Sequence, residues 1–187
     1  MKAKIILLIF ILAAAMLVGC TKPAPAPAPA PTPNPSNATP DTVTTASIVD
    51  NAAAFEKAIS SNGTWIIAIT KDLNVNKELV LDGEYNNGKK DANGKDIIQR
   101  KVALYAQDTD RNITARYTLK APKLTINSPE ASIQHGTFKG DLYVSSKNFK
   151  LIDATVDGNV YFTNDEAKST FSADEKSKVT GKQEMKK

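Results

Sequence analysis

The sequence predicts an all-β domain, a short right-handed parallel β-helix with a capping helix at its N-terminal end. Three observations lead to this prediction: an 18-residue repeat in the C-terminal third, strand-like alternation inside each repeat, and one amphipathic helix ahead of the first strands. A signal peptide and a disordered proline-rich linker are expected to precede the domain.

The repeat emerges when the chain is aligned with itself at a shift of 18 residues. Segments 124–128, 142–146 and 160–164 then coincide and read LTINS, LYVSS and VYFTN. Segments 136–141 (GTFKGD) and 154–159 (ATVDGN) align in the same register. A fixed period is typical of a solenoid, because each coil can bury its apolar face only against neighbouring coils.

Alternation and turn residues define the expected coil. Leu142 and Val144 are expected to point inward and Tyr143 outward, with turns at the two glycines, Gly140 and Gly158. Left-handed β-helices need an aliphatic residue at every sixth position, but steps of six from Leu124 reach Glu130, Gly136, Leu142, Asn148 and Ala154, so the pattern fails. Right-handed coils are therefore favoured, and an antiparallel sandwich is the alternative fold.

The folded domain is expected to span residues 44–181, followed by a charged tail at 182–187. Its first element is a helix over 52–59 with Asp50 or Asn51 as N-cap. No second helix is predicted. Strands are expected at 64–70, 73–75, 78–81, 101–106, 113–119 and 124–127.

Residues 1–19 have the layout of a signal peptide. Lys2 and Lys4 precede an apolar run of about 14 residues, whereas a permanent membrane helix needs about 20. The next residues resemble the lipobox of bacterial lipoproteins, and they are Leu17, Val18, Gly19 and Cys20. The resemblance implies lipidation of Cys20 and cleavage just before it. An ordinary secreted protein is the alternative.

Residues 20–43 form the expected linker, in which proline alternates with alanine. Such a segment favours extended polyproline II and would act as a semi-rigid stalk of roughly 50 to 60 Å. A proline-rich ligand for an SH3-like partner is the alternative. The expected location is the cell membrane, lipid-anchored and facing the extracytoplasmic side.

Two families share architectural features with the domain. The repeats GDLYV (140–144) and GNVYF (158–162) resemble the short coils of bactofilins, which are polymer-forming β-helix proteins. The segments at 54–59, 64–69 and 77–83 resemble the capping helix and first coil of pectate-lyase-like β-helices. Both resemblances concern architecture, and a fold by itself does not carry a function.

The sequence contains few candidate catalytic or metal-binding residues. Without Lys2 and Lys4 the 24 basic residues fall to 22, against 20 acidic residues, with no basic stripe for nucleic acid. His135 is the only histidine and is expected at a corner or on the surface. The acidic loop beginning at Asp91 lacks the glycine and glutamate positions of a calcium-binding EF-hand. No catalytic residue, metal or cofactor is predicted.

Tyr143 and Tyr161 share one position in adjacent repeats and should stack about 5 Å apart on the surface. They suggest either a platform for sugar rings or a ladder that only stabilises the sheet. The expected function is a non-enzymatic scaffold that binds cell-envelope polysaccharide or protein, with self-association through an uncapped C-terminal coil. The alternative is a small carbohydrate-active enzyme.

Overall fold

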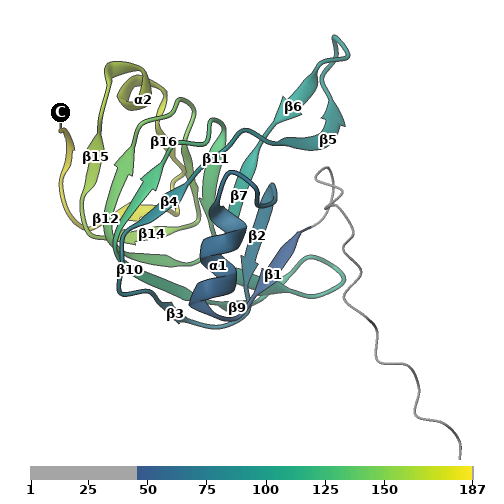
Figure 1. Ribbon diagram of the computed structural model, residues 1–187, viewed down its shortest axis with the longest axis horizontal. Helices are drawn as coiled ribbons and strands as arrows, with labels where there is room; N and C mark the ends of the chain where they lie inside the picture. The colour runs from purple at the N-terminus through teal and green to yellow at the C-terminus, as the bar shows by residue number, and fades with distance from the viewer. Residues whose placement is uncertain (1–45, 187) are drawn as a thin grey trace, which may run out of the picture. The chain divides into compact units, whose positions relative to one another are not determined.

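The computed structural model describes residues 46–186. The predicted signal peptide at 1–19 and the predicted linker at 20–43 lie outside the described residues. Within 46–186 the chain is mostly β-strand, joined into parallel sheets (Figure 1). None of the helices in this part of the chain is long and apolar enough to cross a membrane.

A six-stranded parallel sheet, called sheet A, collects one strand from each pass of the chain. Its strands in spatial order are β1 (Ser47–Val49), β2 (Ile66–Ile69), β7 (Arg100–Ala103), β11 (Ala131–Gln134), β13 (Lys150–Ile152) and β16 (Ser172–Ala173). One buried column runs through four of them in register: Ile67, Val102, Ile133 and Leu151. This column forms one wall of the core.

An eight-stranded parallel sheet, called sheet B, forms the other wall around two long strands, β10 (Thr118–Ile126) and β12 (Thr137–Val144). In the first half of the sheet, β10 pairs with β3 (Leu73–Asn74) and β12 pairs with β14 (Thr155–Asp157). Strand β14 in turn pairs with β17 (Lys178–Val179). In the second half, β10 pairs with β4 (Leu79–Leu81) and β12 pairs with β15 (Val160–Phe162). Strand β15 in turn pairs with β18 (Gln183–Met185). Leu124 faces Leu142, which faces Val160, so the predicted 18-residue register is confirmed.

The core lies between the two sheets. From β10 onward the chain alternates between sheet B and sheet A, and each pass stacks its inward residues on those of the pass before. Nine inward residues of the central strands of sheet B are at most 2% exposed, and these are Leu119, Leu124, Ile126, Phe138, Leu142, Val144, Val156, Val160 and Phe162. Burying each such side chain contributes about 1.5–3 kcal/mol.

Helix α1 (Ala52–Ile59) covers the core at its N-terminal end, as predicted. Asn51 is the N-cap, and its side chain accepts a hydrogen bond from the backbone N–H of Ala54 at 2.9 Å. The apolar face of the helix buries Phe55, Ala58 and Ile59 in the core. The helix thereby shields the first strands from solvent.

Arg100 joins the end of α1 to sheet A. Its side chain is completely buried and lies over the ring of Tyr85, 4.0 Å from the ring centroid. The guanidinium donates to the carbonyl oxygens of Ala58 at 2.9 Å and Ser60 at 3.0 Å, and also to that of Asp82. Burial lowers the pKa of Arg100 to about 10, so the side chain stays charged at neutral pH. A cation at this end also complements the helix dipole.

Glycine is required where sheet B passes from its first half to its second. A Cβ on Gly140 would lie 1.8 Å from the carbonyl oxygen of Ala121, and one on Gly158 would lie 2.0 Å from that of Gly140. The predicted turn at Gly140 is wrong, because this residue lies inside the continuous strand β12. The glycine serves the close approach of neighbouring backbones.

The predicted end of the domain at residue 181 is wrong. β18 continues sheet B through Met185, so residues 182–187 are not simply a charged tail. A second helix, α2 (Asp165–Thr170), precedes it, begins at the N-cap Asn164 and buries Ala167. Because α2 lies between β15 and the last strands, Gln183 pairs with Val160 at 23 residues instead of 18, and the repeat signal is lost.

Two antiparallel hairpins leave the sheets. One comprises β5 (Asn86–Lys90) and β6 (Asp96–Ile98), and the other β8 (Tyr105–Gln107) and β9 (Ile113–Arg116). The strand predicted at 101–106 is therefore divided between β7 and β8, and that predicted at 113–119 between β9 and β10. Alternation alone cannot tell a strand that leaves a sheet from one that stays in it.

The two ends of the sheets differ. Within residues 46–186 no strand lies beyond β16, β17 and β18, which are only two or three residues long, whereas α1 covers the core at the other end. Short edge strands limit unwanted pairing. The outermost strands at the other end, β1, β3 and β4, are equally short, and the self-association expected through the C-terminal end stays a prediction.

Replacing Arg100 tests its role in joining α1 to the sheet. Arg100→Met should lower the free energy of unfolding by about 3–5 kcal/mol, because the three hydrogen bonds from the charged guanidinium to carbonyl oxygens are lost. Urea unfolding measures the change, and Lys95→Met, at an exposed hairpin residue, should change it by less than about 0.5 kcal/mol. A loss below about 1 kcal/mol for Arg100→Met would contradict this role.

Candidate binding face

The outer face of sheet B carries polar and aromatic side chains in aligned columns. They alternate with the buried ladders, so each column continues from strand to strand at the usual spacing of about 4.8 Å. The face comprises Asn74, Thr118, Lys120, Lys123, Thr125, Thr137, Lys139, Asp141, Tyr143, Thr155, Asp157, Asn159 and Tyr161.

The two predicted tyrosines lie together on this face. Thr125 pairs with Tyr143, which pairs with Tyr161, and the two rings are 4.9 Å apart between centroids with a 46° tilt. All three side chains are partly exposed. The prediction of an outward column at the strand spacing is therefore confirmed by the geometry.

Two lysines complete the tyrosine stack. The ammonium of Lys186 donates to the hydroxyl of Tyr143 at 2.7 Å and lies 4.2 Å from the ring centroid of Tyr161. This hydrogen bond raises the pKa of Lys186. Lys123 lies 4.6 Å from the ring centroid of Tyr143. The faces of the two tyrosine rings thus contact ammonium groups and each other. This arrangement supports the interpretation of the tyrosines as a stabilising ladder. A ligand on this surface would meet the ring edges and a tyrosine hydroxyl.

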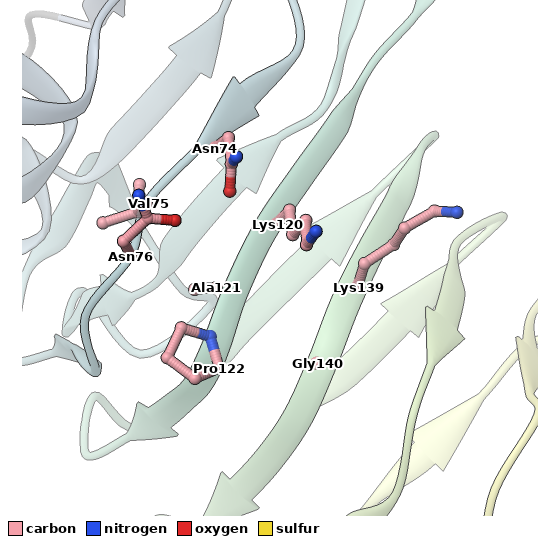
Figure 2. Close-up of a pocket in the computed structure, with 8 residues that line it drawn as sticks. All are labelled: Asn74, Val75, Asn76, Lys120, Ala121, Pro122, Lys139 and Gly140. Atoms are coloured by element: carbon pink, nitrogen blue, oxygen red, sulfur yellow. The ribbon is translucent and has the colours of Figure 1, made fainter.

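A hollow of about 460 Å³ lies at the passage from the first to the second half of sheet B (Figure 2). Its polar lining is Asn74, Asn76, Lys120 and Lys139, and Gly140 contributes no side chain. A neighbouring hollow of about 330 Å³ shares Asn74 and both lysines. The depression therefore extends along the first half of the sheet.

Sequence reasoning missed this hollow because a bulge changes the register. Lys120 pairs with Lys139 at a separation of 19 residues, whereas Lys123 pairs with Asp141 at 18. The additional residue lies between Lys120 and Lys123, where the chain contains Ala121 and Pro122. An alignment at a shift of 19 for the residues before Pro122 would have brought the two lysines together.

A second cluster surrounds His135, which occupies a corner as expected. His135 and Asp153 both have left-handed backbone conformations, with φ of 59° and 48°. Nδ1 of His135 lies 3.1 Å from Oδ2 of Asp153, and Arg116 of the β8–β9 hairpin donates to the same oxygen at 2.5 Å. The Arg116 hydrogen bond, aided by that of His135, lowers the pKa of Asp153. The cluster fastens the hairpin to two stacked corners.

The remaining predicted site residues, Leu17, Val18, Gly19 and Cys20, lie outside the described residues. In the described part of the chain, no group of three or more His, Cys, Asp or Glu side chains is placed to hold a metal ion. Compared with protein-family models, curated proteins and solved structures, the chain has no match.

The Asp153 cluster makes a pH-dependent contribution to stability. Because the folded-state pKa is lowered, the contribution is complete above the ordinary pKa of about 3.9 and is lost as pH falls through the folded value. Asp153→Asn should therefore destabilise the protein at pH 7 and destabilise it less near pH 2, as measured by thermal unfolding. Asp96→Asn, in an exposed ion pair, should have little effect at either pH. An equal loss for Asp153→Asn at both pH values would contradict the assignment.

Proposed function

We propose that this protein is a lipid-anchored, extracytoplasmic lipoprotein whose domain is a non-enzymatic scaffold that binds cell-envelope polysaccharide. The outer face of sheet B is the binding surface. One observation carries the proposal: outward side chains of equivalent positions lie in register on successive parallel strands, as Thr125, Tyr143 and Tyr161 do.

A polymer of identical units suits such a face. Each unit can make a similar contact on the next strand, and many weak contacts then add to a useful affinity. The face offers amide, hydroxyl and ammonium groups, which can hydrogen-bond sugar hydroxyls without closing around them. A single small ligand would instead favour a deep apolar cavity.

The finer architecture is part of the proposal, namely a short right-handed parallel β-helix. Strand pairing in one direction and the alternation of passes between sheets support it. Stacked left-handed corner residues, His135 on Asp153 and Glu130 near Asn148, also favour regular coils. Right-handed connections between parallel strands are by far the commoner kind.

The anchor is the second component of the proposal. The apolar run, the four lipobox residues ending in Cys20 and the proline stalk support membrane attachment outside the cytoplasm. In this arrangement the stalk holds the domain away from the lipid surface, where envelope polymers are accessible.

A second candidate function is a small carbohydrate-active enzyme. It is favoured by a hollow of about 320 Å³ whose lining includes His135, Asp153, Asp174 and Glu175. Glycoside hydrolysis uses two carboxyl groups across one site. The carboxylate of Asp153 is already bound by Arg116, so we favour binding. New reducing ends or unsaturated products from a polysaccharide panel, lost in Glu175→Gln, would favour the enzyme instead.

Polysaccharide binding is tested with a glycan array and affinity electrophoresis. The wild-type protein should bind at least one envelope polysaccharide, and Tyr143→Ala combined with Tyr161→Ala should weaken binding about tenfold, because the variant loses the aromatic stack. Tyr105→Ala is the control, since Tyr105 lies on the hairpin beside His135. If the wild-type protein binds no polysaccharide, the proposed function is wrong.

The anchor is tested on the full-length chain expressed in a bacterium. Wild-type protein should incorporate labelled fatty acid and partition into a detergent phase, and Cys20→Ser should do neither, because the thiol that accepts the lipid is absent. Ser61→Ala, at an exposed residue of the domain away from the lipobox, should be labelled as the wild type is. Labelling of Cys20→Ser would refute lipidation at this cysteine.

A further inference from the structure

Two lysines of the same charge oppose each other on the outer face of sheet B. Lys120 of β10 and Lys139 of β12 are register partners on adjacent parallel strands. Like charges in this position destabilise a sheet. The repulsion falls when an anion lies between the two ammonium groups, because each of them then gains an attractive partner.

Neither lysine is firmly neutralised by the protein. Within residues 46–186 Lys120 takes part in no ion pair, and Lys139 pairs only with Asp157, at 3.4 Å between two side chains that are each about half exposed. Exposed ion pairs of this kind contribute about 0–1 kcal/mol to stability. Breaking the Lys139–Asp157 pair so that Lys139 can bind a ligand therefore costs no more than this. Both ammonium groups are therefore available to a ligand.

The hollow beneath these lysines selects for negative charge. Among its eight lining residues, the only charged side chains are Lys120 and Lys139. Figure 2 places Lys120 between Asn74 and Lys139, on three neighbouring strands, with Asn76 farther along. The amide groups add hydrogen-bond donors next to the ammonium groups, a combination suited to an oxyanion. Two carboxylates lie nearby: that of Asp157 is 3.4 Å from the ammonium of Lys139, and that of Asp72, in the neighbouring hollow, accepts from the backbone N–H of Thr118 at 2.7 Å.

Basic side chains continue along the face. Lys186 and Lys123 flank the tyrosine stack on the second half of sheet B, and Lys123 also pairs with Glu78 at 3.2 Å. We propose that the polysaccharide is anionic and that Lys120 and Lys139 bind its carboxylate or phosphate groups, with the tyrosines contacting the polymer beyond the hollow. This inference depends on the proposed polysaccharide binding and specifies the class of polymer.

The test compares three polymers by isothermal titration calorimetry with the purified protein. They are polygalacturonate, which carries carboxylates, poly(glycerol phosphate), and a neutral glucan. At least one anionic polymer should bind about tenfold more tightly than the glucan, with an affinity that falls as salt rises. The preferred anionic polymer identifies the group that is bound.

The variant Lys120→Gln with Lys139→Gln should lose most of this preference, about tenfold, and keep the residual affinity for glucan. Lys89→Gln with Lys95→Gln removes the same charge from exposed residues of the β5–β6 hairpin and should behave as wild type. Lys120→Glu provides a check on folding. Its thermal stability should equal or exceed that of wild type, since the introduced carboxylate would face Lys139, while binding of the anionic polymer is lost.

Each outcome distinguishes the two proposals. Equal binding of all three polymers, or unchanged binding in Lys120→Gln with Lys139→Gln, overturns the anionic inference and leaves polysaccharide binding intact. If no polysaccharide binds to the wild-type protein at all, the proposed function fails together with the inference. Equal losses in the hairpin control indicate a general effect of net charge and also overturn the inference.

Discussion

Backbone hydrogen bonding between successive passes of the chain fixes the register of everything else in this domain. A single pass of the chain cannot bury its apolar face, because it has no neighbouring pass to exclude water from that face. It gains a core only when its inward residues meet those of its neighbours, as Leu124, Leu142 and Val160 do. A shift of one residue would expose the ladder, so the core and the pairing determine each other.

The same register arranges the outside of the sheet. Because side chains alternate, a buried ladder of Leu142 and Val144 places Tyr143 in an outward column with Tyr161. Packing constrains the inward residues to be apolar, whereas the outward residues are free to be lysine, tyrosine or threonine. An outer face of repeated polar groups is thus a direct consequence of stacking, and its side chains can vary without disturbing the core.

The two ends of the stack are treated differently. At the N-terminal end α1 covers the core, and the buried side chain of Arg100 donates to the carbonyl oxygens of Ala58 and Ser60 at the end of that helix. A cation is suited to this place because its donors satisfy several acceptors at once. At the C-terminal end the outermost strands, β16, β17 and β18, are two or three residues long. The outermost strands at the N-terminal end, β1, β3 and β4, are equally short, so the packing of α1 is what distinguishes that end.

The sequence by itself determined the 18-residue register, the inward ladders, the first helix with its cap, and the outward tyrosine column, because all of these follow from local periodicity. Only the tertiary structure decided the role of Arg100, the bulge that brings Lys120 opposite Lys139, and the continuation of sheet B to Met185 past α2. Each of these involves residues far apart in the chain or a change in repeat length. A fixed-period pattern cannot report a contact that depends on an inserted residue or on a partner some 40 positions away.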